Sequence, residues 1–272
     1  MPRVQTCVEL SFDLQVGGRR LRAKAITPPK RDLADGLPVM VFLHEGLGSI
    51  TQWRDFPRSL VRATGLPALV YDRYGHGQSE ALAGPKLPLY LEEEAVIRLP
   101  EVLSGCGINA PILIGHSDGA TIALLYAAAF PKTVLGVVSE AAHVFIEQES
   151  IQGIWRTLQA FETTPLREQL ARHHGEKVDS MFRGWSNVWL SPGYQDWSML
   201  ERLPRIQAPV LAIQGEDDQY GTPAQVHAIT NRVAGPSQGL LIPGCAHVPH
   251  FQAREKVLAE VTTFVQGLVK HE

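Results

Sequence analysis

The sequence predicts an α/β fold: one doubly wound, mostly parallel sheet with an N-terminal antiparallel hairpin and a helical cap inserted between late strands. Three observations lead to this prediction. Apolar and polar residues alternate near the N-terminus, short apolar segments then alternate with helix-like segments, and one connection between them is far longer than the others. A chain of 272 residues is long enough for one such domain with one insertion.

The first predicted element is a hairpin. Apolar residues occupy every second position from Val8 to Leu14, and residues 20–26 alternate in the same way. Gly17 and Gly18 lie between the two segments. Alternation with a period of two indicates strands with one exposed face, and a glycine pair between them is typical of a tight hairpin turn.

Six short, continuously apolar segments follow, and each precedes a helix-like segment. Strands that are buried on both faces have this composition, because helices cover both sides of a parallel sheet. Their alternation with helices predicts crossover connections and a doubly wound sheet. The predicted strands are Pro38–His44, Ala68–Asp72, Pro111–Ile114, Val134–Ser139, Pro209–Gln214 and Gly239–Ile242.

The connection between residues 139 and 209 holds about seventy residues, whereas a crossover needs only about a dozen. We therefore predict that residues 1–142 and 204–272 form the core and that residues 143–203 form a helical cap over the end of the sheet. The alternative is a surface extension with a minor core of its own. The segment contains helical patterns and the tryptophans Trp155, Trp185, Trp189 and Trp197.

Composition argues against several classes of protein. A net charge of −3, with no block of like charges, disfavours a nucleic-acid partner. No stretch approaches the ~20 apolar residues of a membrane span, and the segment Met1–Leu14 does not resemble a signal peptide. Three widely spaced cysteines predict neither a disulfide framework nor a metal site. We expect a cytoplasmic protein, and the sequence gives no indication of its oligomeric state.

The strongest local signal of chemistry is Gly115-His116-Ser117-Asp118-Gly119. It follows a predicted strand and opens a helical pattern that Pro131 ends, which is the strand–turn–helix context of a nucleophile elbow. The turn is so tight that side chains two residues on either side of the serine would collide with backbone, so both positions are glycine. Ser117 is therefore the predicted nucleophile.

A serine needs a base to activate it and a third group to orient that base. Gly215-Glu216-Asp217-Asp218 follows one late predicted strand, and Pro243-Gly244-Cys245-Ala246-His247 follows the last one. Both segments are loops at the carboxyl ends of strands, where open α/β sheets bind their ligands.

With these motifs the sequence resembles the α/β-hydrolase superfamily over nearly its whole length. The loop His44-Glu45-Gly46-Leu47-Gly48 and the turn Asp72-Arg73-Tyr74-Gly75-His76-Gly77-Gln78-Ser79 match as well. The resemblance implies a catalytic triad of Ser117, Asp218 and His247, in the family's order along the chain. The acid falls on Asp218 because the family's G-x-x-D pattern places it third after the glycine, and Asp217 is the alternative.

The resemblance also implies an oxyanion hole made of the backbone amides of Gly46 and Asp118, with Leu47 as an alternative donor. The family usually has glycine after the loop histidine, but Glu45 replaces it here. The carboxylates of Glu45 and Asp118 would oppose a nearby oxyanion, so we expect them to point away from it and to be paired. The candidate partners are Arg54, Arg73 and a pocket histidine.

The residues expected in or beside the substrate pocket are Glu45, Glu140, His143, Trp185, Trp189 and His250. The tryptophans are chosen because aromatic walls suit a small apolar acyl group. Simple strand-end polarity is the favoured interpretation of Glu140, and His250 lies either in the pocket or behind it.

We therefore predict a serine hydrolase that cleaves a small carboxylic ester, or a related acyl substrate, through an acyl-enzyme intermediate. The expected partner is this small-molecule substrate, with no membrane, cofactor or metal. Alternatives on the same scaffold are a serine-dependent carbon–carbon bond hydrolase, a thioesterase and a lactonase. A ligand-binding receptor with little turnover is an alternative of another class.

Overall fold

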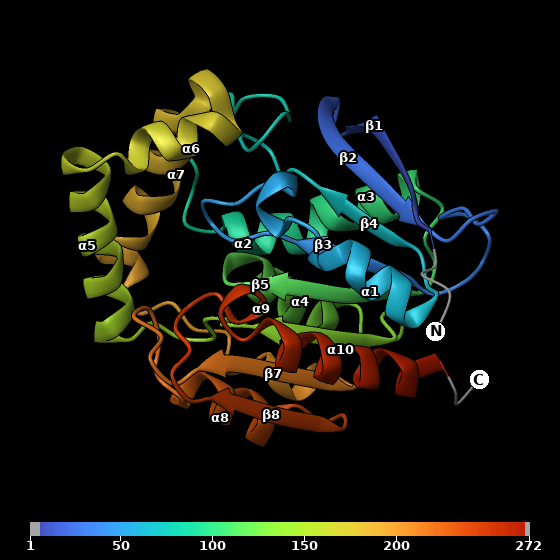
Figure 1. The fold of residues 1–272 in the computed structure, drawn as a ribbon. Coiled ribbons are helices and arrows are strands. Elements are labelled where there is room, and N and C mark those ends of the chain that lie inside the picture. Colours follow the sequence, from blue (N-terminus) through green and yellow to red (C-terminus); the bar gives the residue numbers. More distant parts are fainter. Residues whose placement is uncertain (1–5, 270–272) are drawn as a thin grey trace.

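The computed structural model describes residues 6–269 (Figure 1). Their strands form one eight-stranded sheet in the order β1-β2-β4-β3-β5-β6-β7-β8, and this confirms the predicted fold. β2 is antiparallel to both of its neighbours, and all other pairs are parallel. The strands are β1 (Val8–Val16), β2 (Arg19–Thr27), β3 (Val39–Leu43), β4 (Ala68–Tyr71), β5 (Pro111–His116), β6 (Gly136–Glu140), β7 (Val210–Gly215) and β8 (Ser237–Ile242).

The N-terminal hairpin forms as its alternating pattern predicts. Gly17 and Gly18 both have positive φ angles in the turn, a conformation that glycine adopts without a steric penalty. Most of β1 is exposed, whereas every second residue of the middle of β2 is buried. The prediction about the N-terminal segment also covers residues 1–5, which lie outside the described residues.

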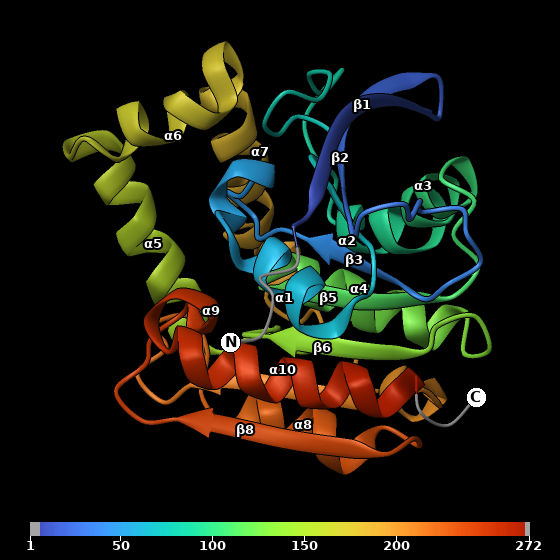
Figure 2. The ribbon, with the colours of Figure 1, turned by 45° about the vertical axis from the view of Figure 1, so that its right-hand side comes forward.

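The parallel strands are buried because helices cover both faces of the sheet, as Figure 2 shows. α1 (Phe56–Thr64) and α10 (Arg254–Val269) pack together on one face, and their apolar side chains share a core with strand residues such as Phe42 and Ile114. α4 (Asp118–Ala129) belongs to the core on the opposite face, with strand residues such as Leu113.

The remaining helices of the core lie between the strands along the chain, except α9, which follows the last strand. They are the 3₁₀-helix Ile50–Trp53, α2 (Tyr90–Glu93), the π-helix Glu94–Arg98, α3 (Leu99–Gly105), the 3₁₀-helix Leu203–Arg205, α8 (Ala224–Arg232) and α9 (Pro249–Gln252). Within residues 6–269, no helix has the length and apolar character that crossing a membrane requires.

The long connection between β6 and β7 is helical. It contains α5 (Gln148–Thr163), α6 (Leu166–His174), the 3₁₀-helix Gly175–Lys177, α7 (Val178–Trp189) and the 3₁₀-helix Pro192–Tyr194. α5, α6 and α7 stand beyond one end of the sheet (Figure 1). A β-bridge joins Phe145 to Ser198 where the segment leaves and re-enters the core. That it functions as a separate cap over residues 143–203 stays a prediction.

Candidate active site

Ser117 lies in a sharp turn between β5 and α4. Its φ of 52° and ψ of −118° are rare for a residue with a side chain, and its amide donates to the carbonyl of Glu140 at 2.8 Å. A Cβ atom at Gly115 would lie 2.3 Å from the carbonyl oxygen of Gly119, and one at Gly119 would lie 1.9 Å from that of Leu43. Both glycines are therefore required for the turn.

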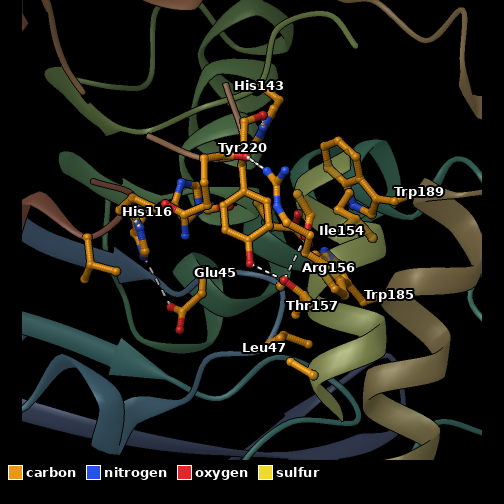
Figure 3. Close-up of a pocket in the computed structure, with 18 of the residues that line it drawn as sticks. Glu45, Leu47, His116, His143, Ile154, Arg156, Thr157, Trp185, Trp189 and Tyr220 are labelled. Atoms are coloured by element: carbon orange, nitrogen blue, oxygen red, sulfur yellow. Dashed lines mark hydrogen bonds and ion pairs between the residues drawn. The ribbon is translucent and has the colours of Figure 1, made fainter. Parts of the chain in front are cut away.

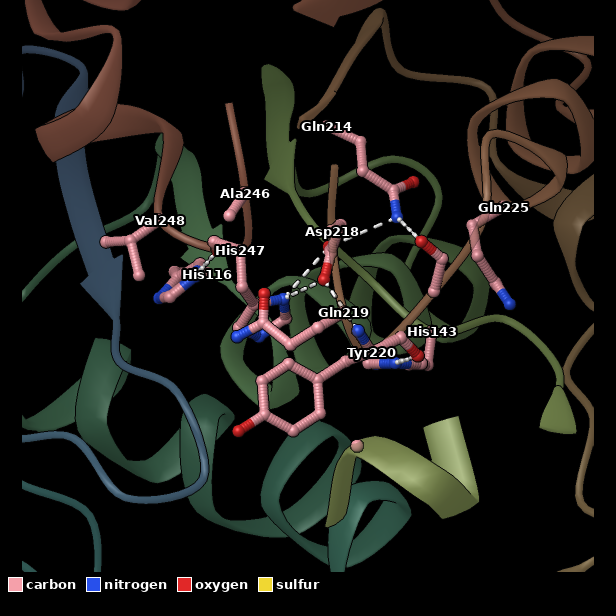
Figure 4. A network of polar contacts seen from close by, with 12 residues as sticks. His116, His143, Gln214, Asp218, Gln219, Tyr220, Gln225, Ala246, His247 and Val248 are labelled. Carbon is pink, nitrogen blue, oxygen red and sulfur yellow. Dashed lines mark hydrogen bonds and ion pairs between the residues drawn. The ribbon is translucent and has the colours of Figure 1, made fainter. Parts of the chain in front are cut away.

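His247 is held by Asp218. The ring nitrogen Nδ1 of His247 lies 2.9 Å from each carboxylate oxygen of Asp218 (Figure 4). With Nδ1–H donating to the carboxylate, Nε2 of His247 is free to accept a proton. Asp218 is buried, whereas Asp217 is exposed and its amide donates to the carbonyl of Cys245. The structure therefore brings Asp218, and not Asp217, to the histidine.

Other contacts fix the Asp218 carboxylate in this position. Gln214 Nε2 donates to it at 3.2 Å, and the backbone amide of Tyr220 donates at 2.9 Å. Burial opposes the ionised form, but the charge of His247, its hydrogen bond and the Tyr220 amide outweigh burial and lower the pKa of Asp218. The group that orients His247 is thus stabilised as a carboxylate.

Ser117 and His247 line the same cavity, and each is less than a tenth exposed. No hydrogen bond between the two side chains occurs among the described residues. Such a contact is often long without substrate and shortens when substrate binds. The structure therefore brings Ser117, Asp218 and His247 together at the carboxyl ends of β5, β7 and β8.

Tyr220 covers His247 on the side of the long insertion. The two ring centroids are 4.5 Å apart, and the Tyr220 hydroxyl contacts Thr157 Oγ1 on α5. A Cβ atom at Gly153 would lie 2.7 Å from Tyr220 Cδ1, so this glycine lets α5 approach the ring. We did not predict Tyr220 from the sequence, although its position two residues after Asp218 is a usable signal.

Hydrogen bonds to the Glu45 carbonyl fix the orientation of the peptide group between Glu45 and Gly46. The Glu45 carbonyl oxygen accepts hydrogen bonds from Arg73 NH2 at 2.9 Å, His44 Nδ1 at 2.8 Å and the Gly48 amide at 3.1 Å. In a trans peptide the carbonyl and the next amide point in opposite directions. The Gly46 amide is therefore directed away from these donors, and Gly46 itself lines the cavity beside Ser117.

Gly46 also makes room for Trp185, because a Cβ atom there would lie 2.4 Å from the indole ring. The glycine is needed at position 46, below Trp185, while position 45 tolerates a side chain. No acceptor for the amides of Gly46 or Asp118 occurs among the described residues, so both remain available to a ligand.

The Asp118 carboxylate is fully buried and paired, as charge considerations predict. Its Oδ2 atom accepts a hydrogen bond from the Tyr90 hydroxyl at 2.6 Å and lies 3.8 Å from Arg73 NH2. Trp189 Nε1 in turn donates to the Tyr90 hydroxyl at 2.8 Å. A chain of polar contacts thus runs from Trp189 on α7 through Tyr90 to Asp118, which lines the cavity.

The Glu45 carboxylate is paired with His116, the residue before the nucleophile. Glu45 Oε2 lies 3.4 Å from His116 Nδ1. Burial alone would raise the pKa of Glu45, but the hydrogen bond and charge of His116 outweigh it, and the pKa lies well below its usual value. Nε2 of His116 donates to the carbonyl of His247 at 2.6 Å. The pair of Glu45 and His116 therefore holds the loop that carries His247.

Glu140 and His250 occupy a place different from the expected pocket. His250 Nδ1 lies 2.9 Å from Glu140 Oε2, and both side chains are buried. The His250 ring packs against Trp53, with centroids 4.7 Å apart. Neither Glu140 nor His250 lines the main cavity. Glu140 is therefore corrected from the expected substrate pocket to a buried position behind it, whereas His250 lines a second, smaller cavity beside the main one.

The main cavity has a volume of about 490 Å³ and two kinds of wall (Figure 3). Apolar side chains from the insertion form one wall, to which α5 adds Arg156 and Thr157, and polar groups gather on the other wall. The apolar residues are Ile154, Leu166, Leu170, Trp185 and Trp189, and the polar ones include Glu45, Gln52, His116, His143 and Tyr220.

His143 lines the cavity between the triad and α7. Its Nε2 atom donates to the Tyr220 carbonyl at 2.9 Å, and its ring lies 4.9 Å from that of Trp189. Burial lowers the pKa of His143, so the ring is stabilised in its neutral form. His143 thus connects the loop of Asp218 and Tyr220 to Trp189 of the insertion.

Comparisons with known proteins agree with this geometry. Residues 40–260 match the model of the Alpha/beta hydrolase family. The chain is 34% identical over 110 residues to the sn-1-specific diacylglycerol lipase ABHD11 of Mus musculus, a match that spans 39% of this chain and only 34% of the mouse protein. It is 21% identical over 266 residues to a proline iminopeptidase of Lactobacillus helveticus, covering 82% of this chain and 87% of that protein.

Among solved structures, the enol-lactonase from Burkholderia xenovorans LB400 superimposes with a TM-score of 0.71 at 19% identity. The superposition covers 93% of this chain and 99% of the lactonase, and at this identity it shows the shared fold alone. Because the family model matches most of the sequence, this chain belongs to the alpha/beta hydrolase family.

Proposed function

We propose that the protein is a serine hydrolase that cleaves small carboxylic esters through an acyl-enzyme intermediate. The observation that carries the proposal is the convergence of Ser117, His247 and Asp218 on one cavity that also receives two unpaired backbone amides.

In the first step, Nε2 of His247 removes the proton of the Ser117 hydroxyl as its oxygen attacks the ester carbonyl. The Asp218 carboxylate holds Nδ1–H and stabilises the imidazolium that forms. Donation from the amides of Gly46 and Asp118 stabilises the tetrahedral oxyanion, by about 3–4 kcal/mol per donor. The carbon–oxygen bond to the alcohol then breaks, and the imidazolium returns its proton to the leaving oxygen.

In the second step, water replaces the alcohol. Nε2 of His247 takes a proton from this water as it attacks the acyl carbon, and the same two amides stabilise the second oxyanion. Collapse of that intermediate breaks the bond to Ser117 Oγ, which regains its proton from His247. The products are a carboxylic acid and a free enzyme, and the cycle uses only this chain's own groups and water.

We further propose that α5, α6 and α7 function as a cap whose side chains bind the acyl group of the substrate. The apolar wall from Ile154 to Trp189 supports this assignment, because an acyl chain gains free energy from burial against such side chains. The cavity volume of about 490 Å³ suits a small substrate.

A fluorophosphonate probe tests the proposal. It should form a covalent adduct on Ser117 of the wild-type protein, located by peptide mass spectrometry, and an activated ester should give a burst of product. The Ser117→Ala variant is the matched control and should show neither. Adduct formation on another serine, or a folded wild-type protein without burst or adduct, would favour a ligand-binding receptor.

A further inference from the structure

A second cavity, of about 260 Å³, opens beside the main one. The two cavities share four lining residues, so these side chains form the boundary between them. The shared residues are Glu45, Gln52, His116 and Val248. We call this second space the side cavity, and its lining further includes Thr51, Arg54 and His173.

The side cavity begins at the end of the active site where His247 lies. Val248 follows His247 in the chain, and His116 donates to the His247 carbonyl at 2.6 Å. Figure 3 shows Glu45 and His116 on one side of the main cavity and Trp185 and Trp189 on the other. Because His247 must protonate the departing oxygen, the alcohol part of an ester lies toward the side cavity.

Two hydrogen-bond acceptors lie at this boundary. Glu45 Oε2 contacts His116, and the backbone amide of Glu45 also donates to this carboxylate. No hydrogen bond from another residue to Glu45 Oε1 occurs among the described residues, and the side chain is 24% exposed. A Cβ atom at Gly48 would lie 2.4 Å from Glu45 Oε2, so the carboxylate is held in a space that only glycine leaves open. Gln52 Oε1 is buried and also lacks a partner. A ligand that donates hydrogen bonds would satisfy both acceptors.

The charges of the side cavity favour a neutral donor. Glu45 Oε2 lies 3.4 Å from His116 Nδ1. Burial lowers the pKa of His116, but the hydrogen bond and charge of Glu45 outweigh burial and raise it, which favours a positive ring at this boundary. Arg54 lines the same space, with its guanidinium 4.5 Å from the Phe251 ring centroid. A cationic alcohol would therefore meet positive charge, whereas hydroxyl groups can donate to Glu45 and Gln52.

We propose that the side cavity is the leaving-group subsite and that Glu45 and Gln52 select esters of neutral alcohols that carry additional hydroxyl groups. The inference rests on the proposed serine hydrolase function. The additional hydroxyl groups donate hydrogen bonds to Glu45 and Gln52 and take no part in the chemical steps. In acylation the ester carbon–oxygen bond breaks, the alcohol oxygen takes its proton from His247, and the alcohol departs through the side cavity.

The test uses esters that differ only in the alcohol. Propyl butyrate and 2,3-dihydroxypropyl butyrate share one acyl group and one carbon skeleton, so the ratio of their kcat/KM values isolates the hydroxyls. For the wild-type protein this ratio should favour the dihydroxy ester by at least about tenfold, because hydrogen bonds to a charged and to a neutral acceptor each add to binding. Glu45→Gln should lower the ratio about fivefold, and Gln52→Leu should lower it as well.

Glu149→Gln is the matched control, because Glu149 is exposed on α5 and lines neither cavity. Its ratio should equal that of the wild-type protein. A wild-type ratio of one or less, or a ratio unchanged in both Glu45→Gln and Gln52→Leu, overturns the proposal. Should Glu45→Gln not fold, the Gln52→Leu ratio decides alone. Failure of the proposed function would look different, because p-nitrophenyl butyrate and both butyrates would then not be hydrolysed.

Discussion

Arg73 NH2 donates a hydrogen bond to the carbonyl oxygen of Glu45 at 2.9 Å, from the buried side of the loop that presents the Gly46 amide. The same nitrogen lies 3.8 Å from the carboxylate of Asp118, the residue that supplies the second proposed oxyanion donor. The buried guanidinium of Arg73 thus contacts the peptide that precedes the Gly46 amide and also the side chain of Asp118, the two residues whose amides are the proposed oxyanion donors.

Arg73→Gln should therefore lower kcat at least tenfold and leave KM within about threefold, because a misplaced amide weakens binding of the transition state and not of the ground state. Affinity for a boronic acid should fall in parallel with kcat. Arg73→Lys, which keeps the charge, should lose less. A rise in KM with an unchanged kcat would show that Arg73 acts on substrate binding instead.

Ser117→Ala should lower kcat at least a thousandfold without unfolding the protein, because the change removes only the nucleophilic oxygen. His247→Ala should have a similar effect, since nucleophile and base act as one unit. Ester turnover measured alongside circular dichroism checks both variants. Near-native turnover by either folded variant would refute the triad assignment.

Asp218→Asn and Asp217→Asn form a matched pair of adjacent isosteric changes. The first should lower kcat by orders of magnitude, because an amide at position 218 favours the wrong tautomer of His247. The second should have little effect, since Asp217 is exposed. Steady-state kinetics of the two variants gives the comparison, and equal losses would contradict the choice of acid.

Trp185→Ala should shift the preferred acyl chain to greater length. The indole packs over Gly46 and lines the cavity, so its removal enlarges the space beside the scissile carbonyl. The assay is the kcat/KM profile over a series of p-nitrophenyl esters. An unaltered profile would show that Trp185 packs the insertion without touching the acyl group.

Mild acid should lower the free energy of unfolding, because His174 is held in its neutral form in the folded protein. Its Nδ1 atom accepts a hydrogen bond from the Gly77 amide at 2.9 Å, and its Nε2 donates to the Leu47 carbonyl at 3.0 Å. Burial lowers the pKa of His174 to about 4, against 6.5 in the unfolded chain. The unfolded state therefore binds a proton first, so stability is complete above pH 6.5 and falls as the pH drops toward 4.

This single group should remove about 2 kcal/mol of unfolding free energy by about pH 5. Urea unfolding at pH 7.5 and pH 5.0 measures the loss. His174→Gln should be less stable than the wild-type protein at pH 7.5, and the gap should narrow at pH 5.0. A gap of the same size at both pH values would exclude His174 as the acid-sensitive group.

Much of the fold could be predicted from the sequence because its information is local. Strands buried on both faces have short apolar sequences, and Gly115 and Gly119 are dictated by a turn that extends over a few residues. The loops that carry Asp218 and His247 could be placed because each follows a recognisable strand.

The supporting contacts could not be predicted in this way. Glu140 and His250 are 110 positions apart, and Tyr90 and Asp118 are 28 apart, so no periodicity relates them. Whether the two members of each pair meet depends on the order of the strands and on how the helices pack on the sheet. The sequence therefore indicates only strand-end polarity for Glu140, whereas the structure shows a buried contact between Glu140 Oε2 and His250 Nδ1 at 2.9 Å.

The insertion leaves and re-enters the core at neighbouring points. Phe145 bridges Ser198, and the Met199 amide donates to the Val144 carbonyl at 2.9 Å. Everything between these points can vary in length and sequence while the ends of the sheet strands stay where they are. If the insertion acts as the proposed cap, its exchange for the corresponding segment of a relative should change substrate selectivity and leave the loops of Ser117, Asp218 and His247 in place.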